Sequence, residues 1–121
     1  MTDIQSAIRD GMHVLRRESG ESVIYARANV ALTVLAVVGS TKFVTSSERG
    51  GTLIVRSVDF LIAAAELAEL GGIPLEGDLI RRLMPVTETY EVVRFNSEPC
   101  WRWRESGRDE LRIHTKLLRR D

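Results

Sequence analysis

Hydrophobic and polar residues alternate with a period of two over most of this chain, a pattern that predicts β-strands. The central segment is the clearest, because residues 53–62 are rich in β-branched and aromatic side chains. Helix-forming residues follow at 63–70, and the Gly71-Gly72 pair then indicates a tight turn. Two further strands are predicted at 79–83 and 89–95.

Residues 29–38 form the most apolar segment, and both faces of the strand predicted there are apolar. Val30 and Leu32 lie on one face, while Leu35 and Val37 lie on the other. A strand with one face in water would be polar on that face. We therefore expect both faces to be covered, either by a helix formed by the first residues of the chain or by a second subunit.

Turn residues divide the rest of the first half. A short strand is predicted at 22–27, before the apolar segment. Gly39-Ser40 predicts the end of that segment, followed by a returning strand at 41–45. The serines and glycines of residues 46–51 indicate an exposed hairpin loop.

The first residues have a different period, which predicts an amphipathic helix at 2–18. Thr2 and Gln5 have the spacing of a capping box. Its apolar stripe consists of Ile4, Ala7, Ile8, Met12 and Leu15. The helix either lies on the sheet or docks on a neighbouring subunit, and the sequence leaves both interpretations open.

The last third predicts two strands, at 99–105 and 110–118. Trp101 and Trp103 lie on one face of the first strand. The other face carries Cys100, Arg102 and Arg104. The tryptophans close one end of the fold, anchor a protein interface or stack on single-stranded nucleic acid. In the second strand we expect the leucines to point inward and Arg112, His114 and Lys116 to point outward, which makes His114 a surface or rim residue.

These elements predict a mainly β fold, a small barrel or sandwich of about eight strands. An N-terminal helix and one short helical insertion at 63–70 complete a single domain over residues 1–121, with the barrel at 21–118. The predicted core residues are Leu32, Val34, Val55, Ile80, Val92 and Ile113.

The composition of the chain disfavours several classes of function. Seventeen basic and seventeen acidic residues cancel, which disfavours a general nucleic-acid or membrane surface. The single cysteine excludes an internal disulfide, and without a leader or an apolar span we expect a cytosolic chain that contacts no membrane. The sequence contains no phosphate loop, metal-ligand spacing or nucleophile elbow, so we expect no enzyme, no catalytic or metal residues and no cofactor. Asp78 is interpreted as a turn residue, and Asp59 as a ladder or subunit contact.

Five short stretches carry a resemblance to a known family. They are VRSVDFLI at 55–62, IPLEGDLI at 73–80, TYEVV at 89–93, WRW at 101–103 and LRIHTK at 111–116. Over residues 20–118 the chain resembles the head–tail joining proteins of tailed bacteriophages and prophages, the head-closure or stopper proteins of the neck. The resemblance implies a structural protein that joins the portal or its adaptor to the tail terminator or tail tube. It further implies a ring of six or twelve copies, monomeric when free, around double-stranded DNA that passes without sequence specificity. Its location would be the virion neck, after assembly in the host cytoplasm.

Ten residues are candidate contacts between subunits or with neighbouring neck proteins. They are Trp101, Arg102, Trp103, Arg104, Val30, Leu32, Leu35, Val37, Leu67 and Leu70. The alternative function is a small β-barrel that binds single-stranded nucleic acid through the two tryptophans and two arginines at 101–104. Zero net charge argues against that alternative, because such affinity comes mainly from clustered cations.

Overall fold

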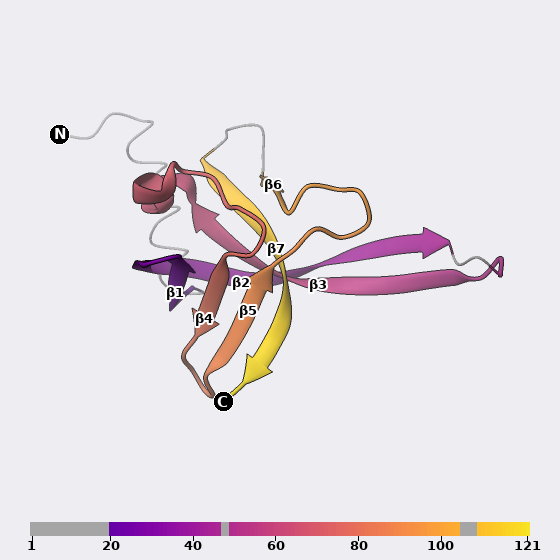
Figure 1. Ribbon diagram of the computed structural model, residues 1–121, viewed down its shortest axis with the longest axis horizontal. Coiled ribbons are helices and arrows are strands. Elements are labelled where there is room, and N and C mark those ends of the chain that lie inside the picture. Colours follow the sequence, from indigo (N-terminus) through magenta and orange to yellow (C-terminus); the bar gives the residue numbers. More distant parts are fainter. Residues whose placement is uncertain (1–19, 47–48, 105–108) are drawn as a thin grey trace.

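The computed structural model describes residues 20–46, 49–104 and 109–121, and these form one antiparallel sheet with a short 3₁₀ helix (Figure 1). The elements are β1 Glu21–Arg27, β2 Val30–Ser46, β3 Thr52–Ala63, η1 Ala64–Leu70, β4 Leu79–Arg82, β5 Glu88–Val92, β6 Trp101–Trp103 and β7 Glu110–Arg120. The described residues are thus mainly β, as predicted, with η1 as the predicted helical insertion. The helix predicted at 2–18 lies outside the described residues.

The strand order within the sheet is β3-β2-β1-β4-β5-β7-β6. β7 pairs not only with β5 and β6 but also with β3, where His114 lies opposite Asp59. The sheet therefore folds back on itself, and β7 links strands that lie far apart in the sheet order. All pairings between neighbours are antiparallel.

The hydrophobic core fills the inner face of this sheet. Alternate residues of six strands, together with Leu67 of η1 and Cys100, point into it. The buried members include Val23, Tyr25, Val34, Ala36, Phe60, Ile62, Ile80, Tyr90, Val92, Leu111 and Ile113. Four of the predicted core residues, Val34, Ile80, Val92 and Ile113, are confirmed by their burial. Leu32 packs against the core but is only partly buried, and the prediction for Val55 is wrong.

β2 is a single strand of 17 residues, so the predicted break at Gly39-Ser40 is wrong. Gly39 pairs with Asp59 and Ser40 with Val58, and the ladder with β3 continues unbroken on both sides. An uninterrupted partner strand overrides the local preference of glycine and serine for a turn. The segments predicted at 29–38 and 41–45 therefore merge, and the described residues contain seven strands where eight were expected.

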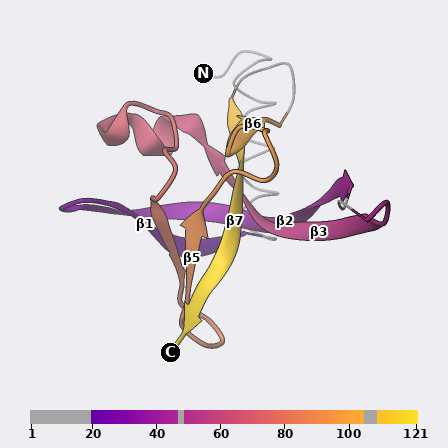
Figure 2. The same cartoon turned by 45° about the vertical axis from the view of Figure 1, so that its right-hand side comes forward.

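The far ends of β2 and β3 leave the body of the protein as a two-stranded arm (Figures 1 and 2). We define the arm as residues 42–46 of β2 and 52–56 of β3, which pair from Lys42 opposite Arg56 to Ser46 opposite Thr52. β2 ends at Ser46 and β3 begins at Thr52, in agreement with the hairpin loop predicted at 46–51. Val55 lies in the arm and is 36% exposed, which explains its absence from the core.

η1 connects β3 to β4 and ends as the glycine pair predicts. Gly71 has φ of 86° and Gly72 has φ of 77°, in the left-handed region that glycine tolerates best. Gly71 N–H donates to Ala68 O, and Gly72 N–H donates to Leu67 O, so the last carbonyls of η1 are satisfied. Leu67 is fully buried and fixes η1 to the core.

Candidate functional site

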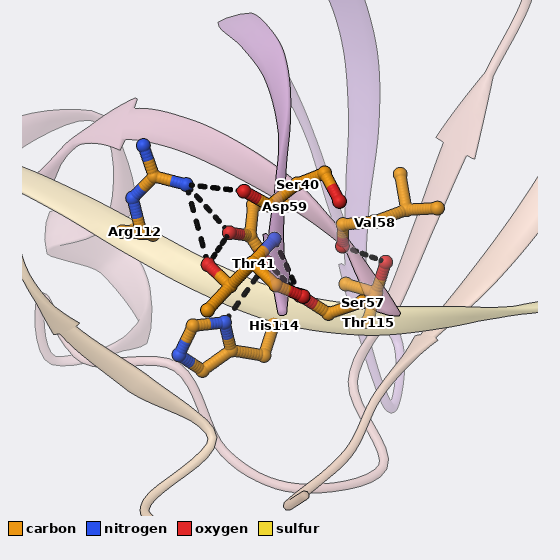
Figure 3. Close-up of polar contacts among 8 residues, drawn as sticks. All are labelled: Ser40, Thr41, Ser57, Val58, Asp59, Arg112, His114 and Thr115. Carbon is orange, nitrogen blue, oxygen red and sulfur yellow. Dashed lines mark hydrogen bonds and ion pairs between the residues drawn. The ribbon is translucent and has the colours of Figure 1, made fainter. Parts of the chain in front are cut away.

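The most concentrated polar chemistry lies at the root of the arm, where β2, β3 and β7 meet (Figure 3). Asp59 of β3 is completely buried there. Its Oδ1 accepts from Ser57 Oγ at 2.5 Å and from His114 Nδ1 at 2.9 Å. Its Oδ2 accepts from Arg112 Nη1 at 2.6 Å and from the Thr41 hydroxyl. We call these five residues the Asp59 network.

Strand geometry explains why these residues converge. Ser57 and Asp59 lie two positions apart on β3 and therefore share a face, as do Arg112 and His114 on β7. His114 is directly opposite Asp59 across the ladder. This face lies opposite the core, and Phe43 and Phe95 cover it by stacking with ring centroids 4.8 Å apart.

The network holds Asp59 in its ionised form. Burial alone would raise the pKa of Asp59, but hydrogen bonds from His114, Ser57, Thr41 and Arg112 outweigh it and lower that pKa well below its usual range. An ionised carboxylate can only accept, so His114 Nδ1 must donate to it. The negative charge of Asp59 is compensated by the guanidinium of Arg112, which is 21% exposed.

One prediction for this network is confirmed and one is wrong. Asp59 was expected to form a ladder or subunit contact, and the ladder contact is confirmed, because its carboxylate bonds His114 across the pairing of β3 with β7. His114 was expected at the surface or rim, yet it is only 4% exposed. The reason is Phe43, whose ring lies 5.1 Å from the His114 ring in an edge-on contact and covers it. The same strand also departs from its predicted alternation at Leu117, which is 41% exposed.

Serine, histidine and aspartate also make up hydrolase triads, but the contacts here differ from those of a triad. Ser57 and His114 both bind the same oxygen of Asp59, so the imidazole does not stand between the hydroxyl and the carboxylate. Ser57 is 2% exposed, which leaves its hydroxyl without access to a substrate. The geometry supports a structural role for the network.

A second buried carboxylate, Asp78, fastens the loop after η1 to β1. Arg27 binds it with two parallel hydrogen bonds, from Nε at 2.9 Å and from Nη2 at 2.8 Å. The Tyr25 hydroxyl and the Leu75 N–H also donate to it. Arg27 further donates to the carbonyls of Leu70 and Ile73. The bond from Leu75 confirms that Asp78 organises its turn.

Burial would raise the pKa of Asp78, but the hydrogen bonds from Arg27, Tyr25 and the Leu75 N–H lower it. Burial and the nearby carboxylate raise the pKa of Tyr25, so this phenol stays protonated and keeps donating. Asp59 and Asp78 are therefore both charged at neutral pH, and each is paired with an arginine.

Trp101 and Trp103 lie on one face of β6, as their spacing predicts, with their rings 5.1 Å apart in an edge-on arrangement. Both are partly buried and pack against the core. Arg102 and Arg104 are exposed, but Arg104 is paired with Glu110 through Nη1 at 2.7 Å. The structure thus brings the four residues together while leaving one arginine with a neutralised charge.

The other predicted contact residues differ in how much of their side chains is exposed. Leu67 is in the core and offers no side-chain surface, and Leu32 and Leu70 are partly buried against the core. Leu35 and Val37 are also partly buried, whereas Val30 at the start of β2 is 37% exposed.

Sequence reasoning missed the arm, which is the largest exposed apolar feature of β2 and β3. Val44, Leu53 and Ile54 are each more than half exposed. The available signal was the strand-forming composition, since residues 30–46 are rich in Val and Thr on both sides of Gly39 and Ser40. A long ribbon that extends beyond the core would then have been expected.

No group of three or more possible metal ligands occurs within residues 20–46, 49–104 and 109–121. In the same ranges, no helix has the length and apolar character that crossing a bilayer requires.

Comparison with known proteins adds one finding. The family model described as phage head-tail joining protein matches residues 2–121, nearly the entire chain. A search of curated proteins gave no match. The family match includes every strand of the sheet, the arm and both buried carboxylate networks.

Proposed function

We propose that this chain, which belongs to the phage head–tail joining proteins, forms a ring in the virion neck between the portal or its adaptor and the tail. Family membership makes the chain a structural component of the bacteriophage virion that helps to join head and tail. The family match over residues 2–121 is the observation that carries the proposal. The ring, its place next to the portal and its contact with DNA are the proposed steps beyond the family.

The distribution of exposed apolar side chains supports a subunit with several neighbours. They gather on the arm, on the loop after η1, and at the end where the β4–β5 turn meets the end of β7. The members are Val44, Leu53, Ile54 and Val55; Ile73 and Leu75; and Leu83, Met84, Val86, Leu117 and Leu118. Exposed apolar patches on a soluble domain are typical of protein contact surfaces. A neck subunit has neighbours beside it, above it and below it, and so requires more than one such surface.

The proposed ring contains six or twelve copies and surrounds the DNA channel. A head-to-tail interface between identical chains closes into a ring when the rotation between them permits. Double-stranded DNA would pass without sequence-specific contacts, and tail terminator or tail tube proteins would bind on the distal side. β7 also pairs with β3, the strand at the opposite edge of the sheet order. This additional pairing supports a small barrel as the body of each subunit. Assembly would take place in the host cytoplasm, from chains that can be monomeric when free.

The exposed parts of Trp101, Arg102 and Trp103 are a proposed contact with another neck protein. Trp and Arg are enriched among residues that dominate binding energy at protein interfaces. Leu35 and Val37 on one face of β2, and Val30 on the other, are proposed as further contacts.

Deletion of the gene tests this function directly. Electron micrographs of lysates from the deletion strain should show DNA-filled heads and separate tails, because packaging precedes closure and the tail is built separately. Expression of the intact protein from a plasmid should restore joined virions. Normally joined virions from the deletion strain would refute the proposed function, whatever the ring geometry.

A further inference from the structure

One face of the arm combines exposed apolar side chains with exposed cations. Val44 lies opposite Ile54, and Lys42 lies opposite Arg56, so the four side chains share this face. Val44 is 57% and Ile54 is 52% exposed, and Lys42 and Arg56 are also exposed. All four side chains are therefore accessible to a partner.

The two cations of this face repel each other, and no described residue pairs with them. Like charges directly opposite one another in an antiparallel pair are unfavourable. Neither Lys42 nor Arg56 forms an ion pair with any residue in the part of the chain that the structure describes. A carboxylate-bearing surface placed on this face would relieve the repulsion and cover the apolar side chains.

Carboxylates and apolar side chains are exposed together on η1 and the loop that follows it. Glu66 and Glu69 of η1 and Glu76 of the following loop are exposed, and Ile73 and Leu75 between them are 44% and 53% exposed. We call these five residues the acidic face. Within the described residues, none of its three glutamates forms an ion pair.

The acidic face is also hollowed beside Leu75 and Glu76. These two residues line an open depression of about 350 Å³ together with Arg27 and Asp78. The Arg27 guanidinium adds no free positive charge there, because it is paired with Asp78. The depression can receive an apolar side chain at the edge of a negatively charged surface.

The arm and the acidic face cannot meet within one chain. η1 and the arm lie at opposite ends of the longest axis (Figure 1), and η1 with the loop that follows it stays on the side away from the arm when the view is turned (Figure 2). Contact between them requires two copies, in which the arm of one chain reaches the acidic face of the next. Such a head-to-tail contact uses different surfaces on the two chains, as closed rings require.

We infer that the arm of each subunit docks on the acidic face of its neighbour and provides the contact that closes the ring. The arm and the acidic face are complementary in two ways, since apolar side chains meet apolar side chains and cations meet carboxylates. The inference rests on the proposed ring and names the two surfaces that form it.

Charge reversal at the two ends separates this pairing from a structural effect. The arm variant is Lys42→Glu with Arg56→Glu, and the face variant is Glu69→Lys with Glu76→Lys. The third protein carries all four changes. A control, Glu98→Lys, reverses an exposed charge outside both surfaces and outside the other proposed contacts. Each protein is produced from a plasmid in the deletion strain, and joined virions are counted in micrographs.

We expect the arm variant and the face variant each to reduce the number of joined virions by about tenfold or more, because like charges then face each other at the contact. The four-fold variant should regain most of the joining, and the control should join normally. Circular dichroism should give similar melting temperatures for the parent protein and the four variants, since the changed side chains are exposed. Rescue by a change at the far end of the molecule cannot arise from a contact within one chain.

The possible failures are distinguishable. Joined virions in the deletion strain itself would refute the neck function. If the deletion abolishes joining but both reversed variants join normally, only the docking inference is wrong. It is also wrong if the arm variant fails and the four-fold variant does not recover, because the arm would then contact another partner, such as DNA or a tail protein.

Discussion

Replacement of Asp59 by alanine tests whether the Asp59 network stabilises the fold. The change removes the acceptor for four donors, from Thr41, Ser57, Arg112 and His114, and leaves a guanidinium that is only 21% exposed without its partner. Loss of one member of a buried ion pair typically costs about 3–5 kcal/mol. Because a domain of this size has a free energy of unfolding of about 5–15 kcal/mol, this is a large fraction of the total.

Thermal unfolding followed by circular dichroism measures the effect. For a chain of this length we expect the melting temperature to fall by about 10–20 °C. Ser57→Ala removes one donor and should cost only about 0.5–1.5 kcal/mol, while Glu98→Gln removes an exposed carboxylate and should cost almost nothing. A fall of less than about 1 kcal/mol in Asp59→Ala would refute the reasoning, since the arginine would then be solvated without Asp59.

Three further predictions address the core, pH and the tryptophans. Val34→Asp places a charge in a site that is 3% exposed, so we expect a loss of several kcal/mol, and a melting curve like that of the parent would contradict the assignment of β2. Asp59 and Asp78 have folded pKa values below the ordinary 3.8, so the unfolded chain binds more protons in acid. We therefore expect stability to fall as the pH drops below about 5, with a smaller fall in Asp59→Asn. Trp103→Ala removes a half-buried ring and should cost about 2 kcal/mol in stability by urea titration. An unchanged stability together with lost head–tail joining would instead assign Trp103 to an interface.

The strands were predictable because their signal is local. Residues 53–62 are mostly β-branched, aromatic or other apolar residues and residues 110–118 alternate, and each segment corresponds to an observed strand within a few residues. The turn at Gly71-Gly72 was predictable for a similar reason, since few other residues tolerate its positive φ. The pattern failed at Gly39-Ser40, where pairing with a distant strand decided the conformation.

The Asp59 network could not be predicted from local patterns. Its charged partners, Asp59 and Arg112, are 53 residues apart, and only the pairing of β3 with β7 brings them together. Alternation along β7 marked Arg112 and His114 as outward-facing, which is correct with respect to the main core. It could not indicate that Phe43 and Phe95 form a second apolar layer over that outer face.

The position of the Asp59 network links the stable body of the protein to the arm. Thr41 and Ser57 pair with each other at the last position before the arm begins, and both donate to Asp59. Phe43, the first buried side chain inside the arm, packs on His114 of the same network. Beyond these contacts the arm is held mainly by the ladder between its own two strands. A two-stranded ribbon by itself is only marginally stable in water, so the direction of the arm depends on how firmly its root is fixed. At the root, the ion pair between β3 and β7 and the hydrogen bonds from Thr41 and Ser57 give the arm a defined direction. The exposed surface of the arm stays available for a neighbouring chain.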